Sequence, residues 1–143
     1  MQKTIQLLQF FAFPALVFSS HLLGVKVLNL YAFFPNIDIP FHFIGGASIA
    51  YTSAQVLFYL EREKLTAPLN GFIFLVLLLS LTAMIAMFWE FAEFSLDQLL
   101  RTNVQVSLAN TMQDQFLGVC GGALCAALYA KKVLARHKDT SKY

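Results

Sequence analysis

Four apolar stretches of membrane length constrain this chain more than any other feature. They cover roughly residues 5–23, 39–60, 69–94 and 110–134. About 20 residues of α-helix cross the hydrocarbon core of a bilayer, and each stretch comes to that length. Of the 143 residues, 58% are hydrophobic and 13% are charged, which is about half the charged fraction of a soluble domain. The sequence therefore predicts a single membrane domain over residues 1–143.

Each stretch is predicted to be a helix, because a lone strand in lipid would leave its backbone N–H and C=O groups without hydrogen bonds. No stretch shows the alternating pattern of a barrel strand. The predicted fold class is an all-α bundle of four transmembrane helices.

The first stretch also has features of a cleaved signal peptide. Lys3 precedes an apolar run, and the small residues Ser19 and Ser20 lie near its end. Gln6 and Gln9 interrupt the run, however, so we favour a span that is retained.

The basic residues predict the orientation of the bundle. Eight of the ten lysines and arginines lie at the N-terminus, in the connection after the second stretch, or in the C-terminal tail from Lys131 onward. Only Lys26 and Arg101 lie in the other two connections. Cytoplasmic segments carry an excess of basic residues, so both termini are predicted to be cytoplasmic. The predicted location is the inner (plasma) membrane, as a multi-pass protein surrounded by lipid.

Acidic residues gather near the opposite, outer side of the predicted bundle. Five of the eight acidic residues and two of the three histidines lie there: His21, Asp38, His42, Glu90, Glu93, Asp97 and Asp114. They come from all four stretches, so residues far apart in the sequence are predicted to share one depth. Acidic groups inside a membrane usually face a bundle interior or a water-filled cavity.

Helical spacing predicts that these side chains also share a direction. Glu90, Glu93 and Asp97 have the spacing i, i+3, i+7, which places them on one side of a helix. Ala83 and Ala86 are predicted to continue that side inward. Two more polar stripes run into glycines, one through Asp38, His42 and Gly46 and one through Asn110, Asp114, Gly118 and Gly122. Small residues four apart let membrane helices approach closely, so the acids are predicted to face the bundle interior.

Several motifs occur together over about residues 38–125. They are an Asp with a His four residues later, Trp-Glu-x-x-Glu, a Thr-Asn-x-Gln loop, and a polar start to a glycine-rich helix. The positions are Asp38, His42, Gly46, Trp89, Glu90, Glu93, Thr102, Asn103, Gln105, Asn110, Thr111, Met112, Asp114, Gly118 and Gly122. This combination resembles the YjdF-like group of small bacterial inner-membrane proteins.

The resemblance implies a membrane fold and a shared polar site, and it implies no established activity. Asn110 departs from the family pattern, in which we expect Asp, and this departure removes one anionic ligand. A weaker similarity, carried by the Asp-x-x-x-His motif and the glycine-rich last stretch, links the chain to VanZ-like membrane proteins.

Three interpretations of the acidic layer stay open. Glu90 and Glu93 can lie at the solvated interface beside Trp89, a residue type typical of the headgroup level. Alternatively, a protonated glutamate can hydrogen-bond to His42 or Asn110 and hold the bundle together, because burial favours the neutral form of a carboxyl group. The third interpretation is a functional site.

A divalent-metal site is the functional interpretation that these residue types favour. Imidazole and carboxylate ligands suit zinc, iron, manganese or magnesium. The predicted ligands are His42, Glu90, Glu93 and Asp114, with Asp38, Asp97 and Asn110 peripheral. A bound cation explains how like charges tolerate one another, and it would assist chemistry on a lipid or envelope substrate. The sequence shows no nucleophile motif, phosphate loop or basic pocket, so catalytic residues, and whether the protein is an enzyme, stay unassigned.

Two other classes of function fit the composition. The acidic layer can gather cations or protons for transport, although four spans without an internal repeat would require a homo-oligomer. The chain can also be a non-enzymatic subunit that binds another membrane protein, with a polar network that fixes the helix register. The basic C-terminal tail is explained by anionic lipid, so no nucleic-acid partner is predicted.

The orientation can be tested with reporter fusions. A reporter fused after Tyr143 is expected to be active only as a cytoplasmic protein, because most basic residues lie on that side. A reporter inserted between Arg101 and Asn110 is expected to be active only as a periplasmic protein. Alkaline phosphatase and a fluorescent protein report the two compartments, and reversal of both signals would contradict the predicted orientation.

Overall fold

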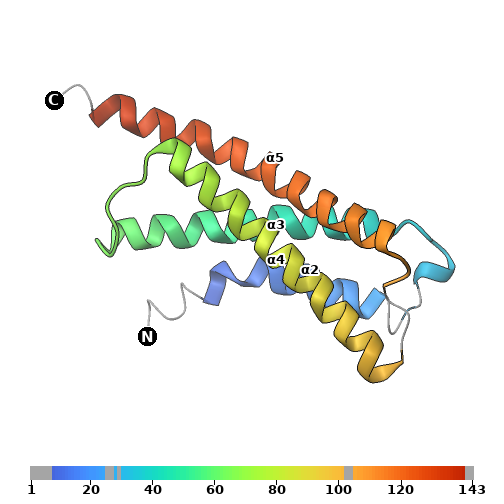
Figure 1. Ribbon diagram of the computed structural model, residues 1–143. Coiled ribbons are helices and arrows are strands. Elements are labelled where there is room, and N and C mark those ends of the chain that lie inside the picture. Colours follow the sequence, from blue (N-terminus) through green and yellow to red (C-terminus); the bar gives the residue numbers. More distant parts are fainter. Residues whose placement is uncertain (1–7, 25–27, 29, 102–104, 141–143) are drawn as a thin grey trace.

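The computed structural model describes residues 8–24, 28, 30–101 and 105–140. Four helices and one short 3₁₀ turn make up the described elements: α2 (Ala12–Leu22), η2 (Leu30–Ala32), α3 (Asp38–Arg62), α4 (Gly71–Leu100) and α5 (Leu108–Thr140). No strand occurs in this part of the chain. The all-α class predicted from the sequence is therefore confirmed (Figure 1).

The helices are arranged around the pair α3 and α5, which lie side by side (Figure 1). Helix α4 packs against both members of this pair and crosses them at an angle, whereas α2 packs its backbone against α3. The start of α2, the α3–α4 connection and the end of α5 lie at one end of the molecule. The η2 turn and the α4–α5 connection lie at the other end.

Two of the described helices are long and apolar enough to cross a membrane, Asp38–Arg62 and Gly71–Leu99. They correspond to the predicted stretches 39–60 and 69–94, and the second helix continues past Asp97. The stretch 110–134 lies within α5. The first stretch overlaps α2, which has 11 residues, and the beginning of that stretch lies outside the described residues.

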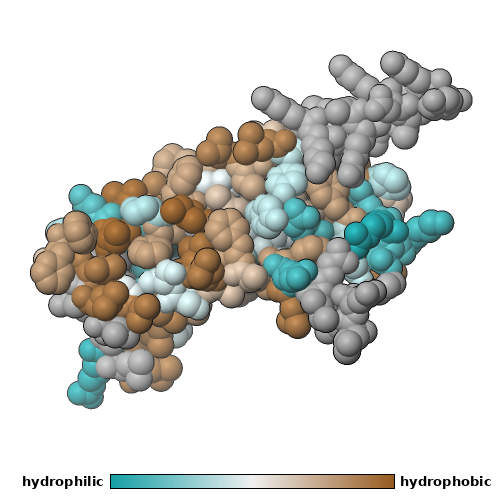
Figure 2. Space-filling model, turned by 180° about the vertical axis from the view of Figure 1, so that it is seen from behind, coloured by the Kyte–Doolittle hydropathy of each residue, from teal (hydrophilic) through white to brown (hydrophobic). Residues whose placement is uncertain are grey.

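The surface of the described residues is rich in large apolar side chains. Ile44, Phe72, Phe91 and Phe116 are among the exposed ones, and they come from three different helices. Figure 2 shows apolar side chains across the middle of one face, with the most hydrophilic ones mainly toward the two ends. Soluble proteins rarely expose apolar area on this scale, so the surface fits a lipid environment.

Glycines set how closely α3 and α5 approach. A β-carbon at Gly46 would collide with the backbone of Gly118, and one at Gly121 would collide with the carbonyl oxygen of Phe43. Lipid gives no hydrophobic force between helices, so close backbone packing of this kind stabilises their association. Gly118 of the glycine pattern in the fourth stretch therefore lies in the α3–α5 interface together with Gly121, whereas Gly122 faces Thr82 of α4.

Helix α4 presents one face to this pair, and that face changes character along its length. Its first half contributes to the apolar core of Ala54, Phe74, Leu78 and Ala126. One turn after Leu78, Thr82 is buried and donates its hydroxyl to the Leu78 carbonyl oxygen at 2.8 Å. Ala83 is exposed, so its predicted inward position is wrong. The helical period from Leu78 brings Thr82, one residue earlier, into the interface instead.

A hydrogen bond from α3 compensates for the proline of the first stretch. Pro14 has no N–H, so the carbonyl oxygen of Phe10 lacks its usual helical donor four residues later. The hydroxyl of Thr52 donates to this oxygen at 2.7 Å. A buried carbonyl left without a partner costs about 1–3 kcal/mol. Thr52 therefore stabilises the position of α2 on α3.

Short-range signals determine where the helices begin and stop at the end of the molecule that holds η2 (Figure 1). Asp38 lies in the first turn of α3, where a carboxylate interacts favourably with the helix dipole. Helix α4 stops at Arg101, which has a left-handed backbone conformation with φ of 53°. The hydroxyl of Ser107 then accepts a hydrogen bond from the N–H of Asn110 at 3.1 Å, a cap for the first turn of α5.

Replacing Gly46 by Ala is expected to destabilise the protein, because the added methyl group meets backbone atoms of Gly118 that have no rotamer to escape into. We expect a cost of about 1–3 kcal/mol, measured as a lower melting temperature in mild detergent. Gly45→Ala is the matched control, since nothing lies within 4 Å of a β-carbon there. Equal losses from the two substitutions would contradict the close crossing of α3 and α5.

Candidate functional site

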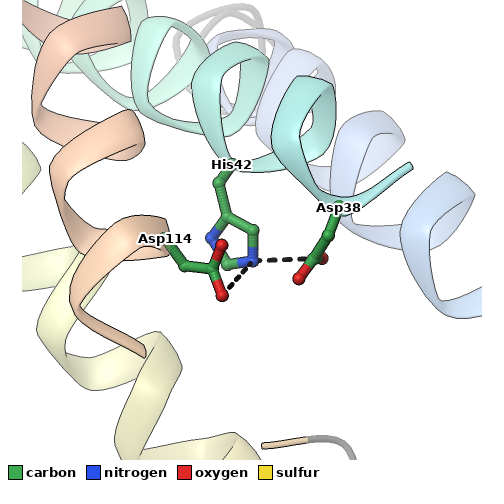
Figure 3. Close-up of side chains that lie close together, drawn as sticks. All are labelled: Asp38, His42 and Asp114. Carbon is green, nitrogen blue, oxygen red and sulfur yellow. Dashed lines mark ion pairs between the residues drawn. The ribbon is translucent and has the colours of Figure 1, made fainter. Parts of the chain in front are cut away.

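Three polar side chains converge where α3 begins. Asp38 and His42 are one turn apart on α3, and Asp114 comes from α5 (Figure 3). The Nε2 atom of His42 lies 3.3 Å from Oδ1 of Asp38 and 3.9 Å from Oδ2 of Asp114. One ligand atom from each residue lies within 4.8 Å of the other two. We refer to these three residues as the Asp–His–Asp cluster.

The contact between Gly46 of α3 and Gly118 of α5 determines which residues meet in the cluster. Gly46 follows His42 by one turn, and Gly118 follows Asp114 by one turn. Since Gly46 packs directly on the backbone of Gly118, the two helices are in register one turn earlier, where His42 meets Asp114. The same contacts that allow α3 and α5 to touch therefore bring an imidazole from one helix to a carboxylate from the other.

The cluster is largely removed from solvent. The side chains of Asp114, His42 and Asp38 are 2%, 10% and 17% exposed. Removing an ion from water costs several kcal/mol, and that cost is repaid only when other groups compensate the charge. Two neighbouring carboxylates at this depth therefore require a cation or protons.

Glu90 lies on the other side of the His42 ring. Its Oε1 atom is 4.0 Å from Nδ1 of His42, whereas Nε2 of that ring faces the two aspartates. Glu90 is 3% exposed, and its Oε2 atom accepts a hydrogen bond from Nε2 of Gln105 at 3.4 Å. A carboxylate behind a metal-ligating histidine typically orients the ring and selects its tautomer. The position of Glu90 suits that role better than the role of a ligand.

Glu93 and Asp97 are held by hydrogen bonds of their own. The indole Nε1 of Trp89 donates to Oε1 of Glu93 at 2.7 Å, and Glu93 is buried. The backbone N–H of Gln105 donates to Oδ2 of Asp97 at 2.9 Å. These bonds join α4 to itself and to the α4–α5 connection, so the two acids support the end of α4.

The residues predicted as ligands thus lie in different places. His42 and Asp114 belong to the cluster, and Glu90 lies behind the imidazole. Glu93 bonds to Trp89. Their assignment as metal ligands stays a prediction.

Two of the three residues predicted as peripheral lie near the C-terminal end of α4 and the N-terminal end of α5. Asp97 bonds to the α4–α5 connection, and Asn110 is half-buried in the first turn of α5. Asp38, the third, is part of the cluster. It begins α3 on the same helical face as His42, so a position at the end of the helix does not keep it away from the cluster.

His21 is the residue near the cluster that the sequence-based ligand set left out. It comes from α2, is 4% exposed, and places Nε2 at 3.3 Å from Oδ1 of Asp38. The sequence predicted that His21 shares one membrane depth with the acidic residues, and this shared depth could have added it to the ligand set. The rotation of α2 about its axis, which decides whether His21 points inward, is not apparent from the sequence.

Fold, surface and cluster together define an all-helical protein of the membrane class with a buried histidine–carboxylate group. The chain matches the family described as "Predicted membrane protein (DUF2238)" over residues 2–136, and it belongs to that family. The predicted resemblance to the YjdF-like group is thereby confirmed. Neither the curated proteins nor the solved structures gave a match to this chain.

Proposed function

We propose that this protein is a multi-pass inner-membrane protein in which the Asp–His–Asp cluster holds a divalent metal ion near the outer face. The observation that carries the proposal is the proximity of three ligand atoms from Asp38, His42 and Asp114, all within 4.8 Å of one another. Ligand atoms lie about 2.0–2.2 Å from a zinc ion, so two of them are at most about 4.4 Å apart. The distances of 3.3 and 3.9 Å from Nε2 of His42 meet that limit.

The charges of the cluster support a divalent ion. Asp38 and Asp114 together supply two negative charges, and the neutral imidazole of His42 supplies none. A divalent cation therefore balances the cluster at a position where net charge is costly. The mixed nitrogen and oxygen ligands favour zinc, iron or manganese over magnesium, which prefers oxygen.

The arrangement of the helices supports the proposed topology. The start of α2, the α3–α4 connection and the end of α5 share one end, which the basic residues assign to the cytoplasm. The Asp–His–Asp cluster lies near the opposite end, at the start of α3. In the proposed four-span bundle, the cluster would lie at the depth of the outer headgroups.

The proposed activity is metal-assisted hydrolysis or group transfer on a lipid headgroup or another envelope substrate. Catalytic metal sites keep a coordination position open beside their protein ligands, and a water molecule or a substrate binds there. When bound, the ion would polarise a substrate oxygen or activate water. The part of Asp38 that is exposed gives that position a route to the surroundings.

A structural role is the competing proposal, and specific contacts favour it. Trp89 bonds to Glu93, and Gln105 bonds to both Glu90 and Asp97. If one or more carboxyl groups of the cluster hold protons, the same groups form a network that fixes the helices without a metal. The two proposals differ in metal content.

Elemental analysis of the protein purified in mild detergent tests the proposal. We expect close to one zinc, iron or manganese ion per chain, and at least about a tenfold loss of affinity in His42→Ala or Asp114→Asn. Gln113→Ala is the matched control beside Asp114, because its side chain is exposed. Chelation is expected to lower the melting temperature of the wild type and of the control, and to leave that of His42→Ala unchanged.

The competing outcome is equally specific. The metal proposal would be contradicted if the wild type contained no metal and its melting temperature did not change on chelation. A near-neutral Glu90→Gln substitution in that protein would then favour the hydrogen-bonded network, since an amide keeps the size and the hydrogen-bonding capacity of a protonated carboxyl group.

A further inference from the structure

His21 is the buried polar group that the Asp–His–Asp cluster does not explain. The residue is 4% exposed, and neither of its ring nitrogens has a hydrogen-bond partner among the described residues. Buried polar atoms in native proteins are almost always paired, so each unpaired one requires an explanation. An imidazole with both nitrogens unpaired lacks the donor and the acceptor partner that burial requires.

The surroundings of His21 leave one polar direction open to it. Its ring packs against the rings of Phe41 and Trp89, with centroid distances of 5.1 and 5.6 Å. On the remaining side, Nε2 lies 3.3 Å from Oδ1 of Asp38. His42 approaches the same oxygen with its own Nε2, also at 3.3 Å. Two imidazole nitrogens therefore converge on one carboxylate oxygen of the cluster.

We propose that His21 supplies a second imidazole ligand to the metal ion, so that the site takes one ligand from α2, two from α3 and one from α5. This inference rests on the proposed metal site and adds a residue and a helix to it. The ligand atoms that lie within 4.8 Å of one another are those of Asp38, His42 and Asp114, so the His21 ring must turn toward the ion when the ion binds. Neither Nε2 atom has a hydrogen-bond partner among the described residues, and each lies 3.3 Å from Oδ1 of Asp38. A cation between them uses the lone pair of each nitrogen and removes the need for either bond.

Charge favours His21 over the glutamates as the fourth ligand. The carboxylates of Asp38 and Asp114 already balance a divalent ion, and a neutral imidazole adds no charge. Glu90 or Glu93 as a charged fourth ligand would leave the buried site with a net negative charge, which is costly away from water. Two histidines with two carboxylates also form a ligand set that suits zinc, iron or manganese.

The inference has a consequence for the fold. Helix α2 packs its backbone against α3, and Thr52 fastens its beginning through the carbonyl oxygen of Phe10. A bond from His21 to the metal ion would fix the C-terminal end of α2 in the same way. Metal binding should therefore slow amide hydrogen exchange in α2 more than in α4, because a group held only in the bound state raises the cost of local opening.

Nuclear magnetic resonance of histidine side chains tests the proposal directly. The chain has three histidines, so a protein labelled with ¹⁵N only in histidine gives a spectrum with few signals. Loaded with ¹¹³Cd²⁺, the wild type is expected to show metal–nitrogen coupling on two histidines, His21 and His42. His137 serves as an internal reference. His21→Ala should keep one coupled histidine and bind the ion at least about tenfold more weakly.

Ser20→Ala is the matched control for α2, since Ser20 is exposed and adjacent to His21. It should keep both couplings and the wild-type affinity. Coupling on His42 alone in the wild type would overturn the assignment of His21 and leave the metal site intact. Coupling on no histidine would overturn the metal site and this inference together. Because the wild-type spectrum decides among these outcomes, the test does not depend on whether His21→Ala folds.

Discussion

The contact between glycines of α3 and α5 is the constraint on which the rest of the structure depends. Gly46 lies against the backbone of Gly118, and a side chain at Gly46 would separate the helices. Membrane helices gain little from burying apolar surface against one another, so backbone proximity and interhelical polar contacts must stabilise their association. One turn away, this proximity brings His42 to Asp114. The same contact therefore supports both the packing and the candidate site.

Most buried polar groups in this molecule are hydrogen-bonded, because an unpaired polar group in an apolar interior is costly. Thr52 compensates for the donor missing at Pro14, and Trp89 bonds to Glu93. Gln105 bonds to two acids of α4. Among the described residues, His21, His42, Asp114 and Thr111 have buried polar atoms without a hydrogen-bond partner. Concentration of unpaired polar atoms at one place is more typical of a binding site than of a structural network.

The sequence predicted the helices and the burial of the acids on one side of α4, because both depend on periodicity and length alone. Glu90 and Glu93 are buried, as their spacing indicated. What the sequence did not determine is rotation about the helix axes and register between helices. Asp38 was assigned to the periphery because it lies at a helix end, yet it shares a face with His42. Ala83 was predicted to lie on the inner face of α4, but Thr82, one residue earlier, occupies that face and Ala83 is exposed. His21 was omitted because the orientation of α2 depends on contacts such as the hydrogen bond from Thr52 to the Phe10 carbonyl oxygen, which is not local in sequence.

X-ray absorption at the metal edge is the most direct test of the central claim that α3 and α5 form a metal site at their glycine crossing. The protein in lipid nanodiscs is expected to give a first coordination shell of nitrogen and oxygen at about 2.0–2.2 Å, with the outer-shell scattering of imidazole. That scattering should disappear in a variant in which both His21 and His42 are replaced. A shell of water oxygens alone would contradict the claim, and so would cysteine sulfur at about 2.3 Å from the metal.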